Sequence, residues 1–127
     1  MSDQVLKDRK VDRPLDKREW ELLVWLIENG DDEAKTLTHE LDQISVAFEC
    51  GCGCASIDFA INKKPVDHSN GISVVSEYQY KSEKGNLMGC FLFTAENHLA
   101  GIDLWSIDGQ ETPEILPTPD KLFPLES

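Results

Sequence analysis

The sequence lacks any long hydrophobic run. No stretch of its 127 residues approaches the roughly 18 consecutive apolar residues that a membrane-spanning helix needs. The first eight residues are polar and mixed in charge, so they do not form the apolar core of a signal peptide. We therefore expect a cytoplasmic protein with no membrane association.

Basic residues are scarce. The chain has 12 Lys and Arg against 24 Asp and Glu, for a net charge of −12 at pH 7. Six of the basic residues fall within residues 1–18, which leaves 6 basic against 20 acidic residues in the rest of the chain. Such a body repels the phosphates of nucleic acids, so we expect no nucleic-acid partner. It attracts a basic protein partner. The alternative is that the acidic charge only keeps the protein soluble.

Catalytic and nucleotide-binding motifs are missing as well. The sequence has no glycine-rich dinucleotide fingerprint, no phosphate-binding P-loop, no nucleophile elbow and no His-Glu-x-x-His pair. The three histidines, His39, His68 and His98, do not have the spacing of a metal site, and none neighbours the cysteines. The sequence therefore favours a protein that is not an enzyme.

One segment carries a strong local signal for a helix. Asp16 and Glu19 have the spacing of a capping box at a helix N-terminus. Apolar residues then recur every three or four positions, and Gly30 suits a left-handed C-terminal cap. The pattern predicts a mostly buried helix over residues 17–29 and a weaker helix over residues 31–42.

From residue 44 onward, apolar and polar residues alternate, which is typical of strands. The expected strands cover residues 44–50, 56–61, 72–81, 87–95 and 99–107. Strands joined by short connections pair antiparallel. The sequence therefore predicts an α+β fold with two N-terminal helices packed on one face of an antiparallel β-meander of about five strands. An uncovered apolar face on this meander would predict a homodimer.

The chain divides into three parts on composition. Residues 1–14 are expected to form a flexible N-terminal arm, and residues 15–112 a single α+β domain. Residues 113–127 contain four prolines and are expected to form an extended C-terminal tail, because proline cannot donate to a central strand ladder.

The four cysteines are the most unusual feature of the sequence. Cys50, Cys52 and Cys54 alternate with glycines, and Cys90 falls in the expected fourth strand. Alternate residues of an extended chain face the same way, so these sulfurs are candidate metal ligands. Soft thiolates suit zinc, although Cys-x-Cys steps are uncommon in zinc sites. A buried structural role fits equally, since cysteine also packs as a small hydrophobe, and redox chemistry is a third alternative.

Four further residues are candidates for an interaction surface. Trp105 and Tyr78 would anchor an interface if they are exposed, whereas their positions in strands also fit the core. Asp58 and Asp103 lie within expected strands, where acidic residues are depleted. They would serve either as a carboxylate pair for acid–base work or a cation, or as residues of the solvent-exposed sheet face.

Three segments of the chain stand out together: WELLVWLIENG at residues 20–30, CGCGCASIDF at residues 50–59 and LAGIDLWSIDG at residues 99–109. They resemble a family of small bacterial proteins without assigned function, over roughly residues 15 to 125. The resemblance implies a bacterial protein and supplies no catalytic residues. In size and charge the chain is also similar to the immunity proteins of bacterial toxin systems.

These observations favour a non-catalytic protein-interaction module, immunity-like in that it binds a basic partner such as a toxin domain. The alternative is a thiolate metal-binding or metal-sensing protein that uses Cys50, Cys52 and Cys54. A small enzyme built on Asp58, Asp103 or Glu77 is the third hypothesis.

Overall fold

A computed structural model describes residues 9–51 and 53–124 of the chain. Its elements follow in the order β1 (Arg9–Arg13), α1 (Lys17–Glu28), α2 (Asp32–Thr36), the 3₁₀ helix η2 (Thr38–Asp42), β2 (Ile44–Glu49), β3 (Ile57–Ile61), β4 (Lys64–Pro65), β5 (Ser73–Lys81), β6 (Leu87–Ala95), β7 (His98–Ser106) and the 3₁₀ helix η3 (Pro119–Lys121). The fold is α+β with an antiparallel sheet, as the sequence predicts. No described helix has the length and apolar character to cross a membrane.

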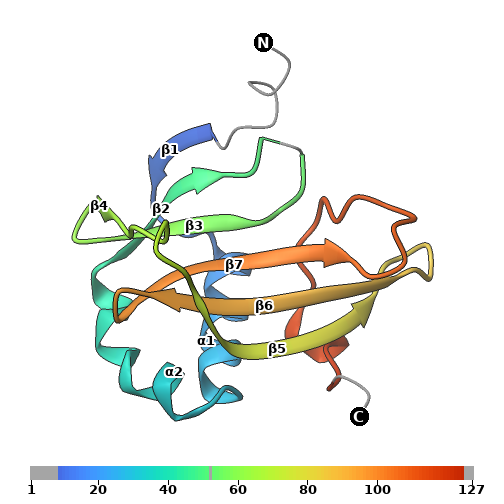
Figure 1. The fold of residues 1–127 in the computed structure, drawn as a ribbon. Helices are drawn as coiled ribbons and strands as arrows, with labels where there is room; N and C mark the ends of the chain where they lie inside the picture. The colour runs from blue at the N-terminus through green and yellow to red at the C-terminus, as the bar shows by residue number, and fades with distance from the viewer. Residues whose placement is uncertain (1–8, 52, 125–127) are drawn as a thin grey trace.

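The sheet has seven strands rather than about five. Its order is β1-β2-β3-β7-β6-β5, and β4 pairs with β3. The prediction of a simple meander was wrong at one place, because β3 pairs with β7 and not with β5, the next long strand in the chain. The segment between β4 and β5 therefore crosses one face of the sheet to reach its far edge (Figure 1).

Strand β1 arises from residues that sequence patterning assigned to a flexible arm. These residues pair antiparallel with β2, and Arg9 lies opposite Glu49. Opposite charges across neighbouring strands stabilise the pairing, a contribution that hydrophobic alternation does not detect. Because β1 precedes α1, the helices are not the first elements of the fold.

Helix α1 begins with the predicted capping box. The backbone N–H of Glu19 donates to Asp16 Oδ1 over 2.8 Å, and the N–H of Asp16 donates to Glu19 Oε1 over 2.9 Å. The helix ends at Glu28, but Gly30 does not adopt the left-handed conformation expected of it. Glycine is needed there because a Cβ would lie 2.7 Å from the carbonyl oxygen of Val75 on β5.

The second predicted helix is shorter than expected. Helix α2 ends at Thr36, and a 3₁₀ turn, η2, continues to Asp42. The side chain of Glu40 in this turn is buried and accepts hydrogen bonds from the backbone N–H of Leu99 and the ring of His98. This buried acid ties η2 to the start of β7.

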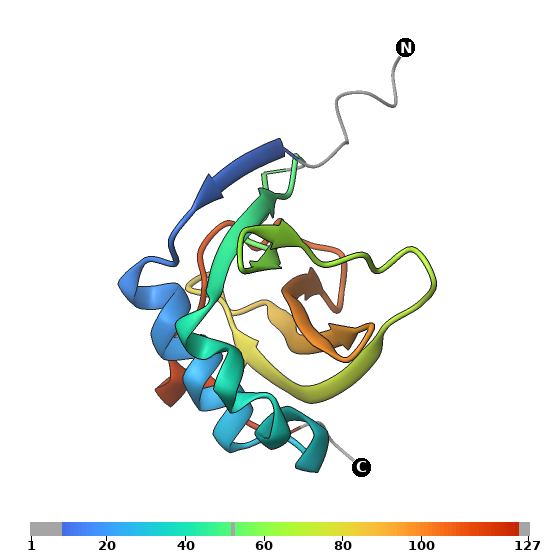
Figure 2. The same ribbon diagram turned by 90° about the vertical axis from the view of Figure 1, so that its left-hand side faces the viewer.

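The main core lies between the helices and one face of the curled sheet (Figure 2). Its fully buried side chains come from α1 and from strands far apart in the sequence. They include Leu22, Leu23, Leu26, Val46, Phe59, Met88, Cys90, Leu92, Leu99 and Ile102. The opposite face of the β5–β6–β7 part of the sheet carries only a small cluster with the β4–β5 segment.

Candidate functional site

Strands β5, β6 and β7 present a mixed aromatic and acidic row on the face that the helices do not cover. The register places Glu77 opposite Phe91, and Phe91 opposite Asp103, so these three side chains lie side by side across the sheet. One step along the strands, Gly89 lies opposite Trp105. We call Glu77, Phe91, Asp103 and Trp105 the docking face.

The glycine opposite Trp105 leaves room for its indole ring to lie against the sheet. A Cβ on Gly89 would lie 2.6 Å from Cε2 of Trp105, so the indole occupies the space that a side chain would otherwise fill. The ring packs against backbone while 40% of the residue's surface stays exposed. A large aromatic side chain that is both restrained and exposed loses little conformational entropy when it is covered.

A small cavity of about 220 Å³ adjoins the docking face. His68 Nε2 lies 3.0 Å from Asp58 Oδ2, and the hydroxyl of Ser56 donates to Asp103 Oδ1 over 2.7 Å. Phe93 lines the same cavity and meets the His68 ring edge to face, with 5.7 Å between the ring centroids. Two carboxylates from neighbouring strands and a histidine from the β4–β5 segment thus line one cavity, and the histidine contacts Asp58.

The Ser56 hydroxyl and the His68 ring are not hydrogen-bonded to each other in the part of the chain that the structure describes. The Ser56 hydroxyl donates to Asp103 and accepts the backbone N–H of Leu104 over 2.8 Å. Within residues 9–51 and 53–124, the hydrogen bonds of the Ser56 hydroxyl go to β7 and not to His68. Nucleophilic catalysis needs the hydroxyl to be aligned with its base, and this hydroxyl instead bridges two strands.

The structure places three of the four predicted interaction residues on one face. The docking face includes Trp105 and Asp103, and its cavity is lined by Asp58. In contrast, Tyr78 lies on the opposite face of β5. The Tyr78 hydroxyl donates to the carbonyl of Asn29 over 2.7 Å, and its ring meets Trp25 edge to face. Tyr78 therefore joins the sheet to the end of α1.

Sequence reasoning missed His68, Ser56 and Phe91 as members of this site. His68 lies 10 positions from Asp58, in the segment between the expected strands 56–61 and 72–81. Ser56 reaches Asp103 across 47 positions because β3 pairs with β7. The non-sequential strand order brings these groups together, and no local pattern in the sequence encodes it.

The cysteines are spread over different environments. Cys50 is disulfide-bonded, Cys54 and Cys90 are thiols, and Cys52 lies outside the described residues. Cys90 faces the main core, where burial raises the pKa of its thiol to about 12. Within residues 9–51 and 53–124, no three His, Cys, Asp or Glu side chains are grouped to hold a metal ion. Zinc binding by this cluster stays a prediction.

Comparisons with known proteins give no match. No protein-family model matches the chain. No curated protein matches it either. The same is true of the solved structures. The resemblance to small bacterial proteins therefore stays a prediction, and function has to be argued from the site itself.

Proposed function

We propose that this chain is a non-catalytic protein-interaction module that binds a basic partner through the docking face. The observation that carries the proposal is the exposed Trp105 ring, which lies over Gly89 on the uncovered sheet face, next to a row that contains the carboxylates of Glu77 and Asp103. Exposed, well-supported tryptophan is the side chain that most often anchors a protein interface.

The charge of the docking face defines its partner. Glu77 and Asp103 flank Phe91 in the register, and Asp58 lies in the adjoining cavity. A lysine or arginine of the partner would stack on the indole of Trp105 and pair with these carboxylates. Arginine suits both contacts, because its planar guanidinium stacks on aromatic rings and forms two parallel hydrogen bonds with a carboxylate.

Exposed aliphatic side chains extend the same surface. Ile72 and Val74 are 46% and 44% exposed, and they lie where the chain enters β5. A second copy of this chain is a poor occupant, since it would bring the same carboxylates face to face. The surface therefore fits a different protein with a positively charged, partly apolar segment.

The test compares two tryptophans that are equally exposed. Trp105 and Trp20 are each 40% exposed, but Trp20 lies on α1. We expect the wild type and Trp20→Ala to retain the same basic protein from an extract of the source organism. We expect Trp105→Ala to bind the recovered protein at least about tenfold more weakly.

A charge pair sharpens this test. Glu77→Lys should abolish binding, whereas Glu21→Lys on α1 makes the same change in net charge and should leave it intact. Binding should also weaken as salt rises, because the attraction is partly electrostatic. Equal recovery by Trp105→Ala and the wild type, or loss of binding in both lysine variants, would contradict the proposal.

A further inference from the structure

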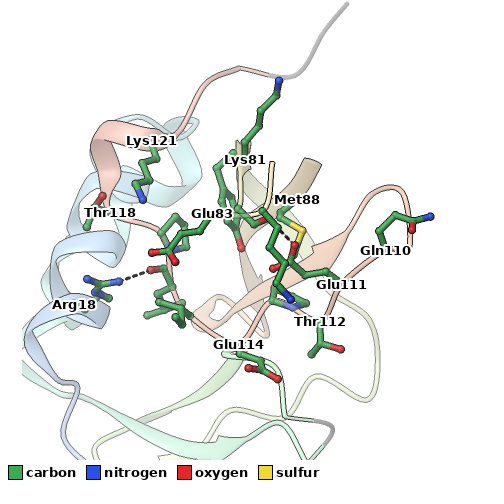
Figure 3. A pocket seen from close by; sticks show the side chains of 17 residues that line it. Arg18, Lys81, Glu83, Met88, Gln110, Glu111, Thr112, Glu114, Thr118 and Lys121 are labelled. Carbon is green, nitrogen blue, oxygen red and sulfur yellow. Dashed lines mark hydrogen bonds between the residues drawn. The ribbon is translucent and has the colours of Figure 1, made fainter. Parts of the chain in front are cut away.

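A second cavity lies away from the docking face, between the C-terminal tail, the β5–β6 turn and α1. Its volume of about 450 Å³ is in the range of small-molecule sites. Figure 3 shows Arg18 from α1 and Lys121 from η3 on one side of it, and Met88 and Glu111 on the other. Four parts of the chain thus close around one space.

Cations gather here in a chain that is otherwise strongly acidic. Beyond residue 18 the chain has six basic residues, and three of them, Lys81, Lys84 and Lys121, line this cavity together with Arg18. Of these, Lys81 directs its ammonium group away from the cavity (Figure 3). None of these four forms an ion pair with another residue in the described part of the chain. Arg18 Nη1 donates to the carbonyl of Leu116 over 2.9 Å, which holds the guanidinium beside the tail.

We propose that this cavity binds a small organic monocarboxylate. Arg18 and Lys121 attract the carboxylate, and the apolar body of the ligand lies against Ile115 and Leu116. These two apolar side chains of the tail line the cavity, and Ile115 is 64% exposed, so they favour a carbon skeleton over a hydrated inorganic ion.

The glutamates in the lining limit the charge of the ligand. Glu83, Glu111 and Glu114 also line the cavity, and the carboxylate of Glu111 already accepts hydrogen bonds from Ser82 and Asn86. A phosphate or polyphosphate would meet these negative charges at close range, whereas a single carboxylate meets less repulsion. Glu83 lies on the same side as Arg18 and Lys121 in Figure 3, so it competes with the ligand for these cations.

The test uses hexanoate as the probe, followed by two-dimensional ¹H–¹⁵N NMR of the full chain. We expect saturable shifts at the amides around Tyr80, Ser82 and Leu116, with a dissociation constant on the order of 1 mM. Hexan-1-ol has the same carbon chain without the charge and should bind much more weakly. Shifts of equal size and affinity with hexan-1-ol, or with inorganic phosphate, would overturn the proposal.

Variants separate the contacts. Arg18→Gln and Lys121→Gln should each weaken hexanoate binding about three- to tenfold. Lys35→Gln removes the same charge from α2 and should leave the affinity unchanged. Glu83→Gln should strengthen binding. If Lys35→Gln weakens binding as much as Arg18→Gln does, hexanoate responds only to the net charge of the protein. That result would contradict the proposed site.

Discussion

At the scale of single residues, two glycines let aromatic rings lie directly on the sheet. Gly89 lies opposite Trp105, and Gly101 lies opposite Phe93 in the β6–β7 register. A Cβ at Gly101 would lie 2.6 Å from Cζ of Phe93, just as a Cβ at Gly89 would collide with the indole. Glycine normally weakens a strand, so its presence here marks the close approach of a ring.

Gly89→Ala should therefore displace the Trp105 ring and lower the free energy of unfolding by about 1 kcal/mol. In a Trp105→Ala background the obstacle is gone, and the same change should be neutral or stabilising by up to about 0.5 kcal/mol, because alanine favours a strand over glycine. Urea unfolding of the four proteins in this cycle measures the change of sign. Equal destabilisation in both backgrounds would mean that backbone and not the indole fills the space.

Cys90 gives a second expectation at this scale. Burial is the largest cause that raises the pKa of its thiol from 9.0 to about 12, and burial likewise raises the pKa of the Tyr80 hydroxyl. A group whose pKa is raised by folding stabilises the protein fully below its unfolded pKa and loses this contribution as pH rises toward the folded value. Alkaline pH should therefore destabilise the fold.

We expect the free energy of unfolding of the wild type to fall between pH 8 and pH 10, with about 1 kcal/mol of the loss due to Cys90. Cys90→Ala removes this titration, so the difference in stability between the two proteins should shrink by about that amount over the same range. Urea unfolding at the two pH values measures it. An unchanged difference would show that the thiol titrates equally in both states.

At the scale of elements, Arg13 joins three of them. Its guanidinium donates to both carboxylate oxygens of Glu19 on α1, at 2.8 and 2.7 Å, and to Glu49 on β2 at 3.0 Å. Glu19 is 5% exposed and also completes the capping box. Hydrogen bonds from Arg9 and then Arg13 lower the pKa of Glu49. Strand β1 thus stays on the sheet through charge pairing as well as its backbone ladder.

Arg13→Ala should cost about 2 kcal/mol of unfolding free energy, because it leaves the buried carboxylate of Glu19 without its cation. Arg9→Ala is the matched control: Arg9 also pairs with Glu49, but its side chain is 69% exposed. Its loss should cost less than about 0.5 kcal/mol. Hydrogen exchange should show faster exchange of β1 amides in Arg13→Ala only. Similar effects of the two changes would place the stabilising contact at Glu49 and not at Glu19.

At the scale of the whole molecule, charge and topology divide the surface into one region rich in carboxylates and another rich in lysines. The docking face carries carboxylates around an exposed indole, while half of the lysines beyond residue 18 surround the cavity beneath the tail. The tail is attached to the body by paired backbone hydrogen bonds of 2.9 Å between Gln79 and Phe123. The two partners that we propose, a basic protein and a small anion, would therefore bind at separate places.

The sequence alone was sufficient for features that depend on neighbours along the chain. The capping box of α1 and the limits of β6 follow from local spacing, because helix and strand periods are properties of the backbone. The acidic balance, and with it the expectation of a basic partner, is also independent of the fold.

Only the tertiary structure decided which distant groups meet. The pairing of β3 with β7 brings Ser56 to Asp103, and the register of β6 and β7 lays Trp105 on Gly89. Alternation shows which residues share a face of one strand, but it says nothing about which strands are neighbours. Strand order depends on how the whole chain buries its core, and for this reason the docking face emerges only when the sheet is assembled.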